Sequence, residues 1–327
     1  MSRGAVLVAG GAGYIGAQTC KVLAQSGYTP VVLDNLSTGH AEAVKWGPFI
    51  QADLTDHNRI TEAIGLYDIK AAIHFAAFSL VGESARDPAK YYQNNVAAAT
   101  QFTASLIAGG VKALVFSSTA AVYGNPQTRL IAEGHPKNPI NPYGASKLAF
   151  EQALHWLSAA HGLKYTVLRY FNAAGADPDG EIGESHACET HLIPLMCQAA
   201  LGKGKPLTIF GTDYDTPDGT PVRDYIHVVD LATAHVAAIE RLMAGGDNDI
   251  FNVGTGSGYS VLEVIKKAEE VMGISVPHSF GPRREGDPEI LVADVNRIRQ
   301  TLNWVPRHSD LETLIRTASH WQNVRPY

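Results

Sequence analysis

The amino-acid sequence predicts an α/β fold, with a doubly wound parallel sheet of the Rossmann type and a second, smaller α/β domain. In the first half of the chain, short β-branched runs alternate with longer helical patterns, which is typical of a parallel sheet with helices on both faces. A glycine-rich turn directly follows the first of these runs. After Asn172 the sequence changes to loops rich in Gly, Pro and Asp that connect shorter elements, which indicates a second domain.

Six apolar runs are predicted to form the strands of the large sheet. They lie at residues 5–9, 31–33, 49–52, 71–75, 113–117 and 165–170. The clearest helices between them are expected near residues 14–25, 88–108 and 143–161. The last two helices are long enough to present an apolar face besides the one that covers the sheet, so we expect them to contact a partner subunit.

The second half of the chain is predicted to hold four shorter elements. They lie near residues 191–201, 229–243, 260–272 and 311–321. We assign residues 1–172 to the first domain and residues 173–327 to the second domain, and we expect a segment near residues 223–250 to return to the first domain.

Composition narrows the class of protein. A chain of 327 residues has room for about two domains at roughly 150 residues each. The formal net charge of −6 leaves no basic surplus for a phosphate backbone, so we expect no nucleic-acid partner. Three scattered cysteines without a CxxC pair indicate a reducing compartment, so we expect the cytoplasm. No run approaches about 18 uninterrupted apolar residues, and therefore no membrane span is expected.

The glycine-rich turn and a later aspartate predict a dinucleotide site. The first strand runs into Gly10, Gly11, Gly13 and Gly16, and a helix follows. Glycines at these positions permit a tight turn and let the backbone approach a pyrophosphate, while the helix N-terminus faces the anion. Asp34 ends the second strand, where a carboxylate accepts hydrogen bonds from a ribose diol and repels a 2′-phosphate. The pattern favours NAD over NADP, and an ordinary tight turn is the weaker interpretation because strand, turn, helix and acid agree.

Thr119, Tyr143 and Lys147 are the candidate catalytic residues. Tyr143 and Lys147 are four residues apart at the start of a predicted helix, so their side chains share one face. A neighbouring ammonium group is expected to lower the pKa of the phenol from about 10 towards neutrality, which would make Tyr143 a general base. Thr119 follows the fifth predicted strand and would orient the substrate oxygen. YxxxK alone usually indicates a solvated helix face, but the hydroxyl and the glycine turn favour catalysis.

With the motifs around these residues, the sequence resembles the extended short-chain dehydrogenase/reductase family, and within it the UDP-glucose 4-epimerases. The similar motifs run almost from end to end: GGAGYIG from Gly10, LDN from Leu33, HFAA from His74, VGES from Val81, NNV from Asn94, FSSTAAVYG from Phe116, NPYGASK from Asn141, RYFN from Arg169, VRDYIHVVDL from Val222 and RREGDPE from Arg283. The resemblance implies a tightly held NAD that is reduced and reoxidised in each turnover, so that UDP-glucose and UDP-galactose interconvert, as in galactose metabolism. It also implies a homodimer in which the two long helices pair as a four-helix bundle.

Further site residues follow from the resemblance. With the residues already named, the candidate cofactor-binding set is Gly10, Gly13, Tyr14, Ile15, Gly16, Asp34, Asn35, Asp53, Leu54, Phe75, Ala76, Ala77, Asn94, Tyr143, Lys147 and Tyr170. The candidate substrate-binding set is Thr119, Tyr143, Asn172, His191, Leu192, Thr208, Phe210, Arg223, Arg284, Asp287 and Leu291. In this set, Arg223 and Arg284 would pair with diphosphate oxygens, and Asp287 would accept from a ribose hydroxyl.

Four positions depart from the family pattern. Ser79 stands where many of these epimerases have a lysine near NAD, and His191 replaces a frequent asparagine beside the sugar. Thr119 replaces the commoner serine and keeps the hydroxyl. Leu291 stands where members confined to glucose and galactose often have tyrosine, so we expect room for N-acetylhexosamine sugars.

Three other functions remain as alternatives. A UDP-pentose 4-epimerase (xylose/arabinose) would share every catalytic residue. A nucleotide-sugar dehydratase would need an acid and a base next to Thr119, where the sequence has Ala120 and Ala121. A non-catalytic NAD sensor would have no need for the YxxxK pair.

Two clusters suggest a metal, and for both we expect none. The run from His186 to His191 gathers His, Cys and Glu, but it lacks the paired spacing of structural zinc sites, so a substrate-proximal loop is expected. In the run Asp213, Asp215 and Asp218, the third acid comes one position late for an EF-hand, which indicates a solvated acidic loop.

Overall fold

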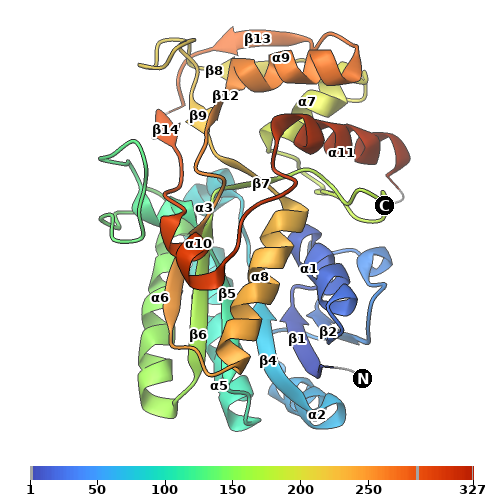
Figure 1. Cartoon of the computed structure of the whole chain (residues 1–327), viewed down its shortest axis with the longest axis vertical. Coiled ribbons are helices and arrows are strands. Elements are labelled where there is room, and N and C mark those ends of the chain that lie inside the picture. The colour runs from blue at the N-terminus through green and yellow to red at the C-terminus, as the bar shows by residue number, and fades with distance from the viewer. Residues whose placement is uncertain (1–2, 285–286, 326) are drawn as a thin grey trace.

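The computed structural model describes residues 3–284, 287–325 and 327, and it confirms the predicted α/β fold (Figure 1). The large sheet has the strand order β11-β6-β5-β4-β1-β2-β3, and all neighbouring strands are parallel. The strands are β1 (Ala5–Ala9), β2 (Thr29–Asp34), β3 (Phe49–Gln51), β4 (Ile69–His74), β5 (Ala113–Thr119), β6 (Lys164–Tyr170) and β11 (Asp249–Val253). The first six match the predicted runs, with ends shifted by at most two residues, and β11 comes from the second half of the chain.

Helices cover both faces of this sheet. α1 (Tyr14–Gln25) and α8 (Val228–Met243) pack on one face, and α2 (His57–Tyr67), α5 (Ala99–Ala108) and α6 (Pro142–His161) pack on the other (Figure 1). β1 and β5 are buried along their whole length, as expected for parallel strands that are covered on both sides. Within the described ranges, no helix combines the length and the apolar character needed to cross a bilayer.

Capping residues determine where α6 begins and ends. The Asn141 side chain accepts a hydrogen bond from the Gly144 N–H at 2.9 Å, and Pro142 takes the first helical position, where an N–H would have no partner inside the helix. Gly162 ends the helix in the left-handed region at φ 70°. This start places Tyr143 and Lys147 in the first turns of α6, at the edge of the sheet where β5 ends.

The helix predicted over residues 88–108 is interrupted. α4 (Pro88–Tyr92) leads into a π-helical segment, Gln93–Ala98, before α5 begins. Asn95 in this segment is buried, and its side chain forms hydrogen bonds of 3.0 Å with both the N–H and the carbonyl of Phe78. The widened turn therefore attaches the helix to the loop that follows β4, and such turns often occur near functional sites.

Some elements carry no clear pattern in the sequence. They are α2, α3 (Val81–Arg86), α10 (Asn296–Leu302) and the 3-10 turns Ala41–Ala43 and Ala120–Tyr123. The 11-residue α2 is the largest of them, and it is held by caps at both ends. Asp56 accepts from the Arg59 N–H at 3.1 Å, and Asp68 ends the helix with φ 51°.

The second unit lies above the carboxyl ends of the large sheet's strands (Figure 1). Its helices are α7 (Leu192–Ala200), α9 (Val261–Met272) and α11 (Leu311–Val324), which enclose a separate apolar core. Its short strands form three small sheets: β8 (Leu207–Phe210) with β13 (His278–Gly281), β9 (Val222–Arg223) with β12 (Tyr259–Ser260) and β14 (Ile290–Leu291), and β7 (Asn172–Ala174) with β10 (Tyr225–His227). The matching helices begin or end within three residues of their predicted bounds.

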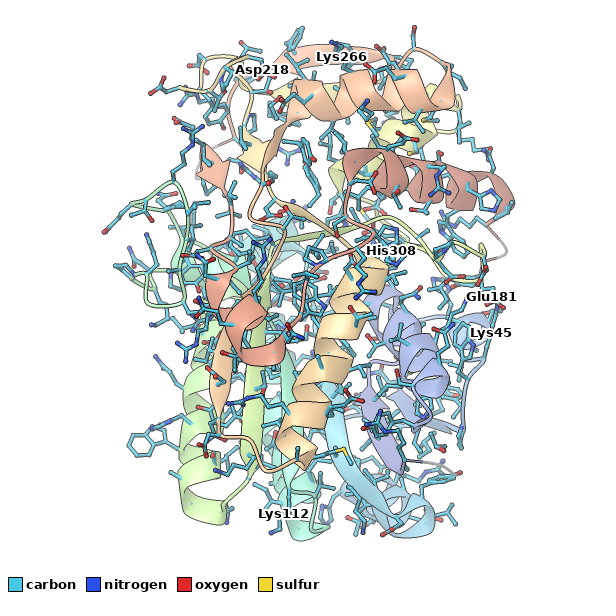
Figure 2. The ribbon with its side chains drawn as sticks, in the orientation of Figure 1. Lys45, Lys112, Glu181, Asp218, Lys266 and His308 are labelled. Carbon is cyan, nitrogen blue, oxygen red and sulfur yellow. The ribbon has the colours of Figure 1, made fainter. Side chains whose placement is uncertain are left out.

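A buried lysine joins the two units. The ammonium group of Lys21, on α1, donates to Asp177 at 2.9 Å, to Asp179 at 2.7 Å and to Glu181 at 2.8 Å, all on the loop between β7 and α7. Lys45 donates to the backbone oxygen of Glu181 at 3.2 Å, and Figure 2 shows these two residues next to each other. The Lys21 and Asp177 side chains are only 7% and 1% exposed, so this ion pair is shielded from water.

Replacing Lys21 tests this connection. We expect Lys21→Met to lower the free energy of unfolding by about 3 kcal/mol, because Asp177 is left buried without its cation. The matched control is Lys45→Met, which removes an exposed lysine that donates to the same loop, and it should change stability by less than about 0.5 kcal/mol. Urea unfolding monitored by tryptophan fluorescence measures both. Equal effects of the two substitutions would show that Lys21 has no special role.

Candidate active site

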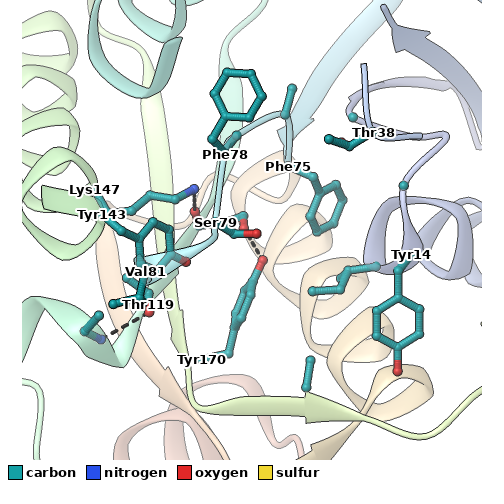
Figure 3. A pocket seen from close by; sticks show the side chains of 18 of the residues that line it. Tyr14, Thr38, Phe75, Phe78, Ser79, Val81, Thr119, Tyr143, Lys147 and Tyr170 are labelled. Carbon is teal, nitrogen blue, oxygen red and sulfur yellow. Dashed lines mark hydrogen bonds between the residues drawn. The ribbon is translucent and has the colours of Figure 1, made fainter. Parts of the chain in front are cut away.

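A cleft of about 470 Å³ opens where the carboxyl ends of the large sheet's strands face the second unit (Figure 3). Parallel sheets bind their ligands at this edge, and the volume is typical of small-molecule sites. The first unit contributes the glycine turn, the end of β2, the loop after β4, the end of β5 and the start of α6. The second unit contributes Glu184, His186, His191, Asp287 and Leu291.

The glycine turn forms a cradle that side chains would fill. Gly10 has φ 81°, and a Cβ atom there would lie 2.5 Å from the Ala76 nitrogen. A Cβ atom on Gly16 would lie 2.1 Å from the Gly10 oxygen. Gly13 precedes α1 without a side-chain cap, so the first N–H groups of the helix are left for an anion at the cleft. This backbone therefore fits the pyrophosphate of a dinucleotide.

Asp34 is held rigidly at the end of β2. Its carboxylate accepts hydrogen bonds from the backbone N–H groups of Ala12 at 3.0 Å and of Leu36 at 2.8 Å. Burial raises the pKa of Asp34, and these hydrogen bonds oppose the shift in part. Next to it, the Asn35 side chain donates to Asp53 at 3.0 Å. A fixed carboxylate on the cleft fits the ribose diol of NAD, as the sequence predicts.

Lys147 is buried in the wall of the cleft. Its ammonium nitrogen donates to the Ser117 carbonyl at 2.8 Å and lies 4.9 Å from the centre of the Phe116 ring. Burial lowers the pKa of Lys147 to about 7, although the charge of Glu151, one turn along α6, opposes this shift. The lysine can therefore gain or lose its charge near neutral pH.

Tyr143 lies beside Thr119 at the cleft (Figure 3). Burial raises the pKa of the Tyr143 phenol, and a hydrogen bond with Thr119 lowers it in part. The sequence-based expectation that Lys147 lowers the pKa of Tyr143 towards neutrality is therefore wrong for the protein without bound cofactor and substrate. The reason is that burial disfavours the phenolate and also discharges the lysine, whose nitrogen is directed at the carbonyl of Ser117.

Hydroxyl groups complete this end of the cleft. The Thr119 hydroxyl oxygen, at the end of β5, accepts from the Ala121 N–H at 3.1 Å and so caps a 3-10 turn. The Tyr170 hydroxyl is hydrogen-bonded to the hydroxyl of Ser117, and Figure 3 shows both bonds. Two phenols and two aliphatic hydroxyls therefore share this end of the cleft with Lys147, in surroundings suited to binding and moving a proton.

The structure brings almost all candidate cofactor-binding residues to the cleft. Every residue of that set lines it except Asp53, which lies just beyond the lining and is held by Asn35 and Thr55. Asp53 accepts from both the backbone N–H and the hydroxyl of Thr55, at 3.0 and 2.9 Å. Its place at the adenine end remains a prediction.

The candidate substrate-binding residues divide into two groups. Six of them line the cleft: Thr119, Tyr143, Asn172, His191, Asp287 and Leu291. The other five lie outside its lining: Leu192, Thr208, Phe210, Arg223 and Arg284. Of these five, Arg223 is connected to the cleft through its ion pair with Asp287. Arg284 and Phe210 contact each other, with the guanidinium 4.1 Å from the centre of the Phe210 ring.

Several cleft residues were not among the sequence candidates. They include Ser37, Thr38, Phe78, Ser79, Val81, Ser117, Glu184 and His186. Ser37 and Thr38 follow Asp34 in the loop after β2, and Ser117 lies at the end of β5, so their position at strand ends could have indicated them. Glu184 belongs to a long loop without periodic pattern, and only the fold brings it here. His186 lies in the run to His191, for which the sequence predicts a substrate-proximal loop, and its position on the cleft agrees with that expectation.

Comparisons with known proteins agree with this geometry. The family model described as "NAD dependent epimerase/dehydratase family" matches residues 6–254. The chain is 50% identical to a UDP-glucose 4-epimerase of Rhizobium leguminosarum bv. trifolii over 321 residues, which is 98% of each chain.

Solved structures are similar over the same length. The chain matches the crystal structure of UDP-glucose 4-epimerase from Brucella ovis in complex with NAD with a TM-score of 0.95 and 50% identity, over 97% of this chain and 98% of that one. It matches the UDP-glucose-4-epimerase from Stenotrophomonas maltophila with bound NAD and formylated UDP-arabinopyranose with a TM-score of 0.96 and 39% identity, over 99% of each. As its resemblance to the UDP-glucose 4-epimerases predicts, the chain belongs to the NAD dependent epimerase/dehydratase family.

Proposed function

We propose that the chain is an NAD-dependent UDP-sugar 4-epimerase that interconverts UDP-glucose and UDP-galactose, a reaction of galactose metabolism. The observation that carries this proposal is that Thr119, Tyr143 and Lys147 share one cleft with the glycine cradle and Asp34. A nicotinamide cofactor and a sugar hydroxyl can meet only in such a cleft. Relatives of nearly the same length that are named UDP-glucose 4-epimerase support the proposal.

The reacting groups have separate tasks. When bound, NAD supplies a ring that accepts a hydride from C4 of the sugar and gives it back. Tyr143 takes the proton of the 4-hydroxyl and later returns it, acting as general base and then as general acid. Thr119 holds the same oxygen through its hydroxyl. Lys147, with a pKa of about 7, provides positive charge beside the phenol whenever it is protonated.

Substrate binding has to leave the sugar free to turn. An epimerisation at C4 must expose both faces of the ring, so we infer that the affinity comes from the UDP part. Arg223, Arg284 and Asp287 belong to the second unit, away from the reacting groups of the first, and they offer charges for a diphosphate and an acceptor for a ribose. Asp287 also lines the cleft, so its ion pair with Arg223 lies at the border of both regions.

The range of sugars depends on the space near Leu291. This residue lines the cleft on β14, where a tyrosine would occupy more room. We infer that UDP-N-acetylhexosamines are also substrates. UDP-pentose epimerisation remains the second candidate, because the Stenotrophomonas relative was crystallised with a formylated UDP-arabinopyranose.

We also infer a homodimer through a four-helix bundle of residues 88–108 and α6. Trp156 on α6 is 71% exposed, and Tyr92 on α4 is 44% exposed. Large aromatic side chains are costly to leave in water, and a second copy of the same face would cover them. The small residues of α5 leave room for close helix packing.

The two units are proposed to bind different ligands. We infer that residues 1–172, together with the segment near 223–250, bind NAD, and that residues 173–327 otherwise bind the substrate. α8 and β11 support this, because they complete the face and the edge of the large sheet. All three cysteines are free, which fits the expected cytoplasmic location.

Removing the Tyr143 hydroxyl tests the proposed reaction. We expect Tyr143→Phe to lower kcat for UDP-galactose by about 10²–10⁴-fold, because the proposed general base for the 4-hydroxyl proton is then removed. Bound NAD should be retained, since the glycine cradle and Asp34 are intact. Proton NMR of the UDP-sugars measures the rate, with UDP-N-acetylglucosamine and UDP-arabinose included to define the range of sugars. The control Tyr92→Phe should behave as the parent protein, and undiminished turnover by Tyr143→Phe would refute the role of this phenol.

The buried lysine predicts a pH dependence of stability. Its folded-state pKa, about 7, lies below the ordinary value of about 10.4, so between these two values the unfolded chain binds more protons than the folded one. The parent protein should therefore gain stability relative to Lys147→Met as the pH rises from 7 towards 10, and Lys147→Met should be the more stable protein at pH 6. Urea unfolding across this range measures the difference. A difference that does not change with pH would mean that Lys147 is not buried as a titrating group.

The dimer can be tested on the exposed tryptophan. Trp156→Glu should convert a dimer into a monomer in sedimentation velocity, because two charges would be buried against each other across the bundle. Leu66→Glu, at a 69% exposed position on α2, is the matched control and should leave the dimer intact. A parent protein that sediments as a monomer, or a Trp156→Glu dimer of unchanged stability, would contradict the inferred interface.

A further inference from the structure

Four metal-binding side chains converge on the loop that precedes α7. They are Glu184, His186, Glu189 and His191, and each offers one ligand atom, all of them within 4.8 Å of one another. Glu184, His186 and His191 also line the cleft. The cluster therefore stands at the rim of the candidate active site, at the end of a loop that has no regular secondary structure from Gly175 to His191.

Both imidazole rings direct the same nitrogen at the same two carboxylates. His191 Nδ1 lies 2.6 Å from a Glu184 oxygen and 3.0 Å from a Glu189 oxygen. His186 Nδ1 lies 3.3 Å from Glu189 and 3.4 Å from Glu184. A neutral or charged imidazole has at most one proton on Nδ1, and this proton cannot point directly at two oxygens. The two rings and the two carboxylates therefore surround one common point.

The two carboxylates of this cluster are buried, and histidines are their only ionic partners among the described residues. The Glu184 and Glu189 side chains are only 6% and 8% exposed. In the described part of the chain, neither of these carboxylates forms an ion pair with a lysine or an arginine; their ionic partners are the two histidines. Two neighbouring buried carboxylates repel each other, and a divalent cation at their centre would compensate both charges.

The spacing of the ligand atoms is close to that of a small tetrahedral site. Zinc lies about 2.0–2.2 Å from nitrogen and oxygen ligands, which places the ligand atoms of a tetrahedron about 3.4 Å apart. The four nitrogen-to-oxygen distances above run from 2.6 to 3.4 Å, with Glu189 presenting one oxygen to each histidine, and all ligand atoms lie within 4.8 Å of one another, so small side-chain rotations are needed to enclose an ion. We propose that Glu184, His186, Glu189 and His191 bind a divalent cation of the zinc class.

Four protein ligands fill a tetrahedral shell, so this is a closed, structural site. Coordination through Nδ1 leaves the opposite ring nitrogen of each histidine as an N–H donor, and both histidines line the cleft. The metal would thus fix the rim of the cleft and orient these donors towards a ligand. Sequence spacing predicts no metal here, because the run lacks the paired motifs of zinc sites. The convergence appears only in three dimensions.

A second acidic cluster in the same loop serves as an internal comparison. The carboxylates of Asp177, Asp179 and Glu181 also converge, but the ammonium group of Lys21 lies among them and accounts for their arrangement. No cation is needed there. Among residues 3–284, 287–325 and 327, no lysine forms an ion pair with the cluster at residues 184–191.

The test is a titration of the full-length protein, freed of metal with a chelator, with Zn²⁺ alone in competition with a chromophoric indicator. We expect one Zn²⁺ per chain, with a Kd of about 1 μM or tighter. Co²⁺ in place of Zn²⁺ should give the intense visible absorption of tetrahedral cobalt. Zinc should also raise the midpoint temperature of unfolding. This experiment needs neither NAD nor a UDP-sugar, so its result is independent of the proposed epimerase activity.

Substitutions identify the ligands. The double variant His186→Ala/His191→Ala should bind no zinc. Glu189→Gln should raise the Kd for zinc by at least about tenfold. The loop backbone should be preserved in this variant, because the amide oxygen can still accept from the Thr190 and His191 N–H groups. Asp179→Asn and Cys188→Ser are the matched controls on the same loop and should bind zinc as the parent does. Two results would overturn the proposal: a Kd for zinc above about 100 μM in the parent protein, or zinc binding that is unchanged in both Glu189→Gln and the double variant. Either result would mean that these four side chains form only a cluster of hydrogen bonds and ion pairs.

Discussion

The candidate site depends on the placement of two ionisable side chains in the first turns of one helix. Asn141 and Pro142 start α6 where β5 ends, so Lys147 is buried and Tyr143 is half-buried at the edge of the sheet. Burial keeps the proton on the phenol and brings the pKa of the lysine to about 7. In the proposed reaction these two groups would therefore transfer protons from a site in which neither is permanently charged.

The long loop between β7 and α7 connects this chemistry to the second unit. Its first part is held against α1 by Lys21, and its last part carries the cluster at residues 184–191 on the rim of the cleft. A loop of this length costs conformational entropy to order, so each of these attachments has to fix part of it. The proposed function assigns proton transfer to the sheet edge and sugar selection to the loop and β14, which belong to separate units.

Sequence patterns locate features that depend on local periodicity. The bounds of α1, the common face of Tyr143 and Lys147, and the glycine cradle all follow from neighbouring residues. Features that depend on distant residues are not visible in this way. The pKa direction of Tyr143 results from burial by several elements, the π-helical turn at residues 93–98 from a contact with Phe78, and the cluster at residues 184–191 from the folding of an aperiodic loop.

The central claim is that hydrogen leaves C4 of the sugar and returns to it without entering water, while Tyr143 exchanges only the hydroxyl proton. Incubation of the purified protein with UDP-galactose deuterated at C4, followed by NMR of the UDP-glucose formed, measures this directly. The account predicts that deuterium is retained on C4 of the product and that none appears in the solvent. Loss of the label to water, or uptake of solvent deuterium at C4 in the reverse experiment, would contradict it.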